Sequence, residues 1–397
     1  MRIIQITAVS STVKAFLLPL IEKLSEKGHE LIIITSDGIE DLKQNEILKQ
    51  HNVKVYQAPI PRSLSPIKLF KAYRTLIKQF QALKPDVVHT HTPVASLLAR
   101  KAATKAKVPQ IIYTCHGFYF HENMQPLKKK LFTWLEKNAA QKNTDYIFTV
   151  NQEDMDFAIE NDFIQKDKIL NINSVGINTT TKFNPALFTI EAKQILKKEL
   201  NLNQTDKIIT FIGRLVAEKG IIELIEAFSL LKKQRNDVKL LMIGETLQSD
   251  RDKKAKDIIK QIIQTNKLEN DIHFTGFRTD IANLLSITDV FVLPSHREGM
   301  PVSSLEAMSM GIPVVGTNIR GLREEIIEDK TGFIVPLQNP EKLSAAINKS
   351  LNQFKPPEEN IRNHIIENFD EKKVLERQLK VFEEIEKNIS PKQKSHP

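Results

Sequence analysis

The feature that most constrains the fold is a repeated alternation of short apolar runs with longer amphipathic segments. The amphipathic stretches at 13–27 and 66–83 have helical composition, and they separate apolar runs of strand length. Strands separated by helix-length segments predict a parallel sheet with helices on both faces, and ligands bind such sheets at the carboxyl ends of the strands. The strands of the first series are predicted at 3–6, 31–34, 53–56, 87–89, 111–114, 146–150 and 169–172.

The alternation stops at 173–205, a polar stretch with a run of threonines, and then starts again. A chain of 397 residues is long enough for two cores. We therefore predict an α/β protein of two doubly wound, Rossmann-like domains, at 1–178 and 179–370. Residues 371–388 form a charged amphipathic helix. The second series of strands is predicted at 208–212, 239–243, 272–274, 290–293, 313–315 and 333–335.

The net charge of +9 belongs almost entirely to the first domain. Residues 1–185 hold 25 Lys and Arg against 17 Asp and Glu, and the remainder is nearly balanced. A basic face serves nucleic acid, anionic lipid or solubility; no aromatic and basic signature of an RNA module is present. With a single cysteine, Cys115, no signal-peptide profile and no apolar run of membrane-spanning length, we expect a cytoplasmic protein.

The stretch 297–307 places two carboxylates around a predicted helix start. Glu298 follows the strand at 290–293, and Glu306 lies inside the helix that begins near Pro301. Free N–H groups at a helix start favour an anion such as a diphosphate, and carboxylates on either side can accept bonds from sugar hydroxyls. The alternative is that these glutamates only complement the helix dipole. The turn between them begins with Gly299, Met300, Pro301 and Val302.

Two cations follow the first strand of the second domain. Gly213 ends that strand, and Arg214 and Lys219 lie five residues apart on the next loop. Arg can bind a diphosphate bidentately while Lys acts as a point charge. The alternative is a pair of solvated loop cations.

His116 follows the strand at 111–114 and precedes Gly117, which gives a substrate room to approach. A lone histidine is more often structural than catalytic. A zinc site is a rival interpretation, but paired Cys or His spacing is missing, so no metal is expected. The residues of that rival site are His89, His91, Cys115, His116 and His121.

Together these motifs, with the Gly311 to Gly316 segment, resemble the retaining glycosyltransferases of family 4, which have the GT-B fold of two Rossmann-like domains facing across a cleft. The resemblance implies a UDP-sugar donor on the second domain, an acceptor on the first, and a last helix that returns to the first domain. It also implies that Arg214 and Lys219 hold the diphosphate without a metal or other cofactor.

The resemblance extends to further residues of the donor site. It implies that Glu306 binds the ribose, Glu298 the hydroxyls of the donor sugar, and His116 the reacting centre. The glycines after the next two strands, with a neighbouring ring, would contact uracil and ribose: Gly244, Gly276 and Phe277.

One loop departs from the family pattern. Many members carry a Gly-Gly pair after the first strand, whereas this chain has Ser10, Ser11 and Thr12 in the loop 7–12, so we expect their hydroxyls to contact the acceptor instead. The loop resembles that of enzymes extending undecaprenyl-diphosphate-linked sugars in capsule, exopolysaccharide or glycan assembly.

The segments 61–78 and 128–135 combine basic residues with apolar ones. They predict peripheral attachment of the first domain to an anionic inner-leaflet membrane surface, with a solvated helix face as the alternative. The expected activity is transfer of a hexose or N-acetylhexosamine from a UDP-sugar to a lipid-linked saccharide. The alternatives are a UDP-sugar epimerase and a basic nucleic-acid-binding protein; the oligomeric state is left open.

Overall fold

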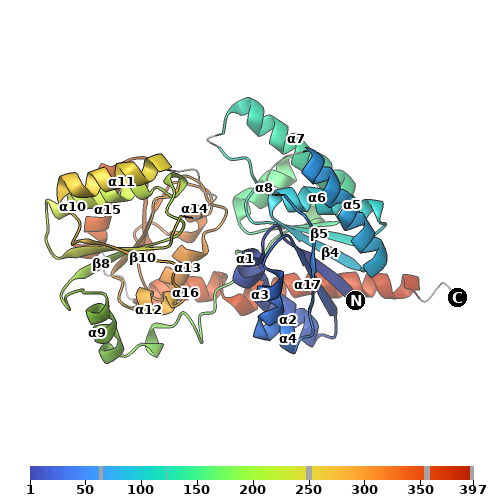
Figure 1. Ribbon diagram of the computed structural model, residues 1–397, viewed down its shortest axis with the longest axis horizontal. Helices are drawn as coiled ribbons and strands as arrows, with labels where there is room; N and C mark the ends of the chain where they lie inside the picture. The colour runs from blue at the N-terminus through green and yellow to red at the C-terminus, as the bar shows by residue number, and fades with distance from the viewer. Residues whose placement is uncertain (62–65, 123, 247–252, 353–357, 394–397) are drawn as a thin grey trace. The chain divides into compact units, whose positions relative to one another are not determined.

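The structure, a computed structural model, describes residues 1–61, 66–122, 124–246, 253–352 and 358–393. The chain divides into two compact units (Figure 1). Unit 1 comprises Met1–Val175 together with the C-terminal segment from Lys372, and unit 2 comprises Gly176–Glu371.

Unit 1 is built on a seven-stranded sheet in which neighbouring strands are all parallel, in the order β3-β2-β1-β4-β5-β6-β7. Each strand lies where the sequence predicted one, so the doubly wound arrangement is confirmed. The strands are β1 (Arg2–Ile6), β2 (Glu30–Thr35), β3 (Lys54–Gln57), β4 (Val87–His91), β5 (Gln110–Cys115), β6 (Tyr146–Thr149) and β7 (Ile169–Asn171).

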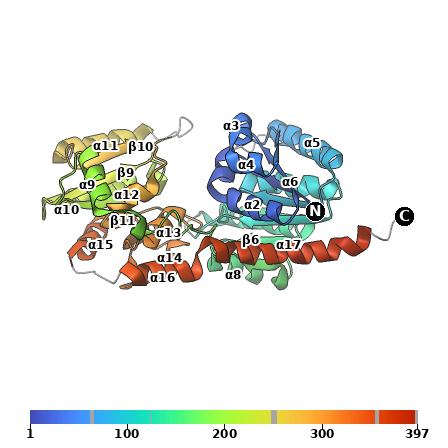
Figure 2. The same cartoon turned by 90° about the horizontal axis from the view of Figure 1, so that it is seen from below.

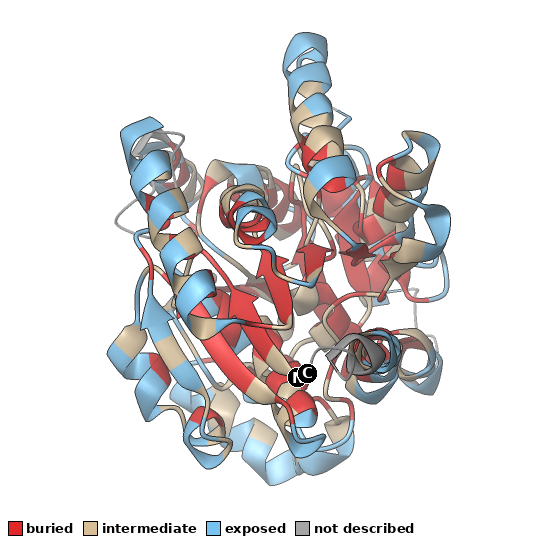
Figure 3. Cartoon of the chain, turned by 90° about the vertical axis from the view of Figure 1, so that its right-hand side faces the viewer, coloured by how far each residue is buried: buried red, intermediate tan, exposed pale blue. Residues whose placement is uncertain are grey.

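Helices cover both faces of this sheet, which explains why its central strands are almost continuously buried. Helices α5 (Pro66–Leu83), α6 (Pro93–Lys105) and α7 (Pro126–Asn143) pack side by side on one face. The other face carries α17 (Glu371–Gln393), whose Phe382 ring lies 5.8 Å from the ring of His89 (Figure 2). The central strands are therefore buried, whereas the edge strand β3 and the outer sides of the helices are mostly exposed (Figure 3).

The connection after β1 differs from the predicted loop. Ser10–Thr12 forms the short helix α1, Val13–Leu17 is a π-helical turn, η1, and α2 runs over Leu18–Glu26. Pro19 explains the wider turn, because a proline cannot donate a helical hydrogen bond and its ring clashes with the carbonyl four residues earlier. The remaining helices of unit 1 are α3 (Ile39–Gln44), α4 (Glu46–Gln50), α8 (Gln152–Glu160) and η2 (Lys166–Lys168).

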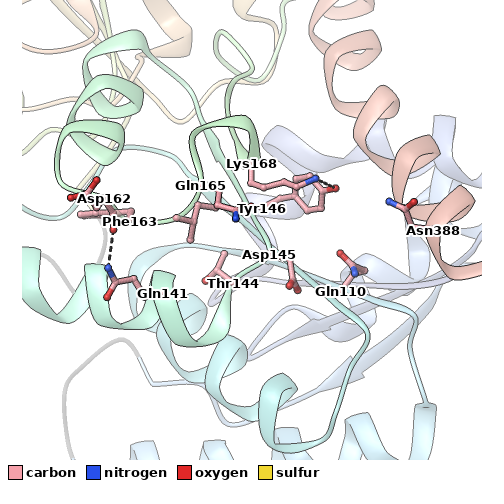
Figure 4. A pocket seen from close by; sticks show the side chains of 11 residues that line it. Gln110, Gln141, Thr144, Asp145, Tyr146, Asp162, Phe163, Gln165, Lys168 and Asn388 are labelled. Atoms are coloured by element: carbon pink, nitrogen blue, oxygen red, sulfur yellow. Dashed lines mark hydrogen bonds between the residues drawn. The ribbon is translucent and has the colours of Figure 1, made fainter. Parts of the chain in front are cut away.

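The predicted C-terminal helix at 371–388 is longer in the structure and ends at Gln393. It is anchored at the amino-terminal edge of the sheet, where Glu384 accepts hydrogen bonds from Tyr146 and Lys168, both at 2.9 Å. A polar hollow of about 660 Å³ opens beside this anchor, between the starts of β5, β6 and β7 and Asn388 of α17 (Figure 4). No predicted site residue lines it. None of the described helices is long and apolar enough to span a membrane.

Unit 2 contains a six-stranded parallel sheet in the order β10-β9-β8-β11-β12-β13, and each strand again lies at a predicted position. An isolated antiparallel bridge between Gly244 and Gly276 extends the β9–β10 pair. The strands are β8 (Lys207–Ile212), β9 (Val238–Ile243), β10 (Ile272–Gly276), β11 (Val290–Leu293), β12 (Val314–Thr317) and β13 (Gly332–Val335).

The helices of unit 2 also form two layers. Helices α10 (Ile221–Lys232), α11 (Lys253–Asn266) and α15 (Pro340–Asn352) lie on one face of the sheet, and α13 (Val302–Ser309) packs against α16 (Glu358–Asn368) on the other (Figure 1). The shorter elements are η3 (Pro185–Leu187), α9 (Ile190–Glu199), η4 (Ala217–Lys219), α12 (Ile281–Ser286) and α14 (Leu322–Glu325).

Each sheet has one point where the strand order reverses. In unit 1 it lies between β1 and β4, and in unit 2 between β8 and β11. The connections from these strands leave in opposite directions, which opens a crevice at their carboxyl ends, the usual ligand site of a doubly wound sheet. The predicted site residues of each unit follow these strands or their neighbours.

Candidate active site

The predicted donor residues of unit 2 meet at its reversal point. Lys219, at the end of η4, forms a 2.5 Å ion pair with Glu298, which follows β11. Their side chains are only 20% and 12% exposed, and Ser295 donates a second hydrogen bond, of 2.8 Å, to the same carboxylate oxygen. Charge-assisted bonds in a partly covered site are strong and fix geometry. The loops after β8 and β11 therefore form one polar site.

Gly220 allows the loops after β8 and β11 to come into contact. It has a φ of +69°, and a Cβ at this position would lie 1.9 Å from the carbonyl oxygen of Pro294. Only glycine combines this left-handed conformation with such a close backbone contact. The turn from η4 into α10 is thus held directly against the loop that carries Glu298.

Arg214 lies on the same loop as Lys219 and is more open to solvent, with a side chain 45% exposed. Its guanidinium lies 4.0 Å from the carboxylate of Glu218, which also pairs with Arg297 at 3.2 Å. The backbone of the two loops is joined as well, since the N–H of His296 donates to the Glu218 carbonyl. The site therefore combines three cations with two carboxylates.

Three of the predicted glycines lie together where β8, β9 and β10 end. The N–H of Gly213 donates to Ile243, and the N–H of Gly244 donates to Gly276. Gly244 has a φ of +132°, and a Cβ there would lie 2.0 Å from the Gly213 carbonyl oxygen. The result is a surface made of backbone, followed directly by Phe277, whose side chain is 70% exposed. Such a surface suits a flat ring that stacks and hydrogen-bonds to the main chain.

The helix after this site begins one residue later than predicted. Pro301 is the N-cap of α13, with φ −74° and ψ 122°, and Val302 is the first helical residue. The extended ψ at Pro301 turns the chain into the helix, and the hydroxyl of Ser304 donates to the Pro301 carbonyl at 2.9 Å. Gly299 and Met300 lie just before the cap, where Gly321 packs directly against the carbonyl of Gly299.

Two carboxyl groups in and beside α13 titrate abnormally. Burial raises the pKa of Glu306 to about 7, and the positive charge of Lys182 opposes this only in part. Burial also raises the pKa of Glu325, in α14, well above its usual range. The hydrogen bond that the Ser304 hydroxyl donates to the Glu325 carboxyl opposes this rise only in part.

His116 lies at the reversal point of unit 1. Its Nε2 is 3.2 Å from Nδ1 of His91, and Nε2 of His91 is 2.9 Å from the side-chain oxygen of Gln5. Phe16, in the π-helical turn η1, stacks on the His116 ring with 5.5 Å between centroids. Burial lowers the pKa of His116 to about 4, so the imidazole is neutral near pH 7.

The hydroxyl residues after β1 differ in accessibility. Ser11 is exposed and Ser10 is half-buried, with its N–H donating to Asp37 at 2.7 Å. Thr12 is only 8% exposed because it faces the interior where α1 continues into η1. Thr12 is therefore less accessible than Ser10 and Ser11, and contact of these three hydroxyls with an acceptor stays a prediction.

The metal interpretation gains no support from the geometry. Among the residues that the structure describes, no group of three or more His, Cys, Asp or Glu side chains is placed to hold a metal ion. His89, one of the proposed zinc ligands, instead bonds through Nε2 to the Thr114 hydroxyl at 2.6 Å.

Comparison with known proteins relates this arrangement to one enzyme family. Residues 13–173 match the model described as Glycosyltransferase Family 4, and residues 192–372 match that of Glycosyl transferases group 1. The chain is 32% identical over 330 residues to the UDP-Gal:alpha-D-GlcNAc-diphosphoundecaprenol alpha-1,3-galactosyltransferase of Escherichia coli, covering 80% of this chain and 81% of that one. The chain belongs to glycosyltransferase family 4.

Two further comparisons cover nearly the whole glycosyltransferase. The Campylobacter jejuni N,N'-diacetylbacillosaminyl-diphospho-undecaprenol alpha-1,3-N-acetylgalactosaminyltransferase is 27% identical over 401 residues, covering 98% of this chain and all of that one. The crystal structure of Anabaena HepE in complex with UDP and glucose has a TM-score of 0.79 at 18% identity, covering 97% of this chain and all of HepE. The fold of the glycosyltransferase is accordingly GT-B.

Several interactions of these sites were not predicted from the sequence. Lys219 and Glu298 were predicted in separate ligand roles and not as a pair, and Ser295 and Gln5 were not among the predicted residues. A signal for Gln5 was present, because Gln5, His89 and His91 are polar residues within runs of strand length. Alternate residues of a strand share one face, so such positions indicate a polar cluster inside a sheet.

Proposed function

We propose that this glycosyltransferase moves a hexose or N-acetylhexosamine from a UDP-sugar to a saccharide linked to undecaprenyl diphosphate, with retention of configuration. The observation that carries the proposal is the Lys219–Glu298 pair at the reversal point of unit 2, next to Arg214. Support comes from the names of the E. coli and C. jejuni relatives, both of which specify a diphosphoundecaprenol sugar. The likeness to HepE is support for the fold alone.

The donor diphosphate would replace Glu298 as the partner of Lys219. Arg214 and Lys219 supply two positive charges near the start of α13, where the helix dipole adds a further attraction for anions. Once Lys219 turns to the diphosphate, the Glu298 carboxylate is available to accept bonds from sugar hydroxyls, while Ser295 keeps it oriented. The ion pair thus preorganises both groups before the donor binds.

The nucleoside would occupy the backbone surface of Gly213, Gly244 and Gly276. Main-chain groups there can bond to the uracil edges, and the exposed ring of Phe277 offers a stacking partner. Glu306 would accept bonds from the ribose hydroxyls, and it does so best as a carboxylate.

The reaction itself would be a front-face displacement. The bond between the anomeric carbon and the UDP oxygen breaks, a bond from the acceptor oxygen to the same carbon forms, and the acceptor proton passes to the departing phosphate oxygen. Arg214 and Lys219 stabilise the charge that builds on that diphosphate, the electrostatic contribution that is usually the largest in group transfer. His116 would bind a hydroxyl of the transferred sugar.

The direct test is UDP formation from a panel of UDP-sugars, with and without an undecaprenyl-diphosphate-linked saccharide. Glu298→Ala and Lys219→Ala should each lower turnover by about 10²–10³-fold. A matched control is Lys207→Ala, which removes another ion pair, Lys207–Asp289, at the opposite end of β8. Full turnover by Glu298→Ala would refute the assigned role, and an altered sugar nucleotide formed without acceptor would instead indicate an epimerase.

We also propose that unit 1 attaches to an anionic membrane surface through α7. Leu127, Leu131 and Trp134 lie at helical spacing on α7 and are 85%, 53% and 60% exposed, and exposed lysines flank them. Helix α5 presents Ile67 and Phe70 in the same way, beside further basic residues. Residues 62–65 of the predicted basic segment lie outside the described residues. An apolar stripe flanked by lysines fits an interface of anionic headgroups over acyl chains.

Vesicle flotation tests this attachment. Wild type should float with vesicles that contain phosphatidylglycerol and not with vesicles of neutral phosphatidylcholine. The triple variant Leu127→Ser, Leu131→Ser and Trp134→Ser should not float with either. Ile190→Ser in unit 2 is the control, because Ile190 is 71% exposed but belongs to the other unit. Equal recovery of the triple variant and wild type would refute the role of α7.

A further inference from the structure

A chain of hydrogen bonds runs from the interior of unit 1 to His116. Its members come from three adjacent strands of the sheet. Gln5 is on β1, His91 is on β4, and His116 directly follows β5. The register pairs Gln5 with His89, and His91 with Thr114, so all of these side chains share one face of the sheet.

The donor of each hydrogen bond can be assigned by starting from Gln5, at the buried end of the chain of hydrogen bonds. The side-chain oxygen of Gln5 can only accept, so Nε2 of His91 must carry the proton of their 2.9 Å bond. A neutral imidazole has one N–H, which leaves Nδ1 of His91 as an acceptor. Nε2 of His116, 3.2 Å away, is then the donor, and Nδ1 of His116 is unprotonated.

The surroundings keep both rings neutral. His91 is 1% exposed, and burial, followed by the nearby His89 and His116, lowers its pKa well below the usual value. Within the part of the chain that the structure describes, no carboxylate is among the groups that influence the pKa of His91 or His116, so none of them offsets the cost of a buried charge. These hydrogen bonds therefore fix which nitrogen of His116 carries the proton, and they do not place a positive charge on the ring.

We propose that Gln5 and His91 are positioning residues that hold His116 as the neutral Nε2–H tautomer, so that His116 meets a sugar hydroxyl through Nδ1 as a hydrogen-bond acceptor. The second half of this inference rests on the proposed function, in which His116 faces the transferred sugar. The proton of the acceptor then goes to the departing phosphate oxygen, while His116 orients a hydroxyl.

Nitrogen NMR of histidine-labelled full-length protein tests the tautomer without any substrate, since the protonated and bare nitrogens of a neutral imidazole have well-separated ¹⁵N shifts. His116→Gln and His91→Gln assign the two resonance sets. Wild type should show Nε2–H for both rings. Gln5→Met, which keeps the length of the side chain but removes the acceptor, should give His116 a mixture of tautomers. Thr114→Val removes only the bond to His89 and is the control that should leave His116 unchanged.

Kinetics provides the second readout. Gln5→Met should lower kcat roughly tenfold, the usual effect of losing one hydrogen bond's worth of orientation, with little change in KM for the donor. An Nδ1–H tautomer of His116 in wild type, or an unchanged tautomer and kcat in Gln5→Met, would overturn the proposal. If wild type shows the expected tautomers but turns over no UDP-sugar, the proposed function is refuted, whereas the roles of Gln5 and His91 in holding the His116 tautomer are supported.

Discussion

Replacement of Glu306 by glutamine gives a quantitative test of the environment of the α13 carboxyl group. Burial raises the pKa of Glu306 from 4.5 to about 7 in the folded protein. At about 1.4 kcal/mol per pH unit, this shift corresponds to about 3 kcal/mol of unfolding free energy. Glutamine has the same shape and no charge, so it removes this contribution.

The sign follows from proton binding. Between pH 4.5 and 7 the folded state keeps the proton of Glu306 and the unfolded state releases it, so stability falls as the pH rises through this window. Below pH 4.5 both states are protonated and the penalty is zero. Glu306→Gln should therefore match wild type at pH 4 and be more stable by about 3 kcal/mol at pH 8.

Urea denaturation of wild type and variant at pH 4, 6 and 8 measures this difference, monitored by signals from unit 2. Glu269→Gln is the control, because Glu269 is exposed in the connection between α11 and β10 and should give the same small difference at every pH. If the stability difference between Glu306→Gln and wild type does not grow between pH 4 and 8, burial does not raise the pKa of the Glu306 carboxyl.

The same variant connects stability to binding. If Glu306 accepts bonds from the ribose, UDP should bind wild type more tightly at pH 8 than at pH 6, because the carboxylate form becomes dominant above its pKa of about 7. Calorimetric titration of Glu306→Gln should show weaker binding at pH 8 and no such pH dependence.

Three further outcomes follow from buried or close-packed groups. Glu136→Gln should destabilise unit 1 by about 3–5 kcal/mol, because it leaves Arg100 buried without its anionic partner, whereas Glu40→Gln at an exposed pair should have almost no effect in the same urea titration. Gly220→Ala should lower thermal stability and abolish turnover, while Gly28→Ala, with nothing within 4 Å of the new methyl group, should cost only backbone strain. The contribution of His116 to the stability of unit 1 should be lost as the pH drops from 6.5 to about 4, because burial lowers the folded pKa of His116 to about 4, and His116→Gln should reduce this loss in acid denaturation of unit 1.

The sequence by itself determined the two parallel sheets and the edges of them at which ligands are expected. Strand-length apolar runs such as 290–293 have to be buried on both faces, and helix-length segments between them favour parallel pairing, which needs such crossovers. The positions of Arg214, Glu298 and His116 directly after such runs then placed them at the carboxyl edges of the sheets. Hydrophobic periodicity and segment length are local properties, so they can be read along the chain.

The tertiary structure decided which side chains meet. Lys219 and Glu298 are 79 residues apart and pair only because β8 and β11 are neighbours and Gly220 lets their loops touch. Gln5 reaches His91 across 86 residues for the same reason, through the pairing of β1 with β4. The pKa of Glu306 likewise depends on what covers it. Contacts and burial are set by the order of strands in space, and the local pattern carries no information about that order.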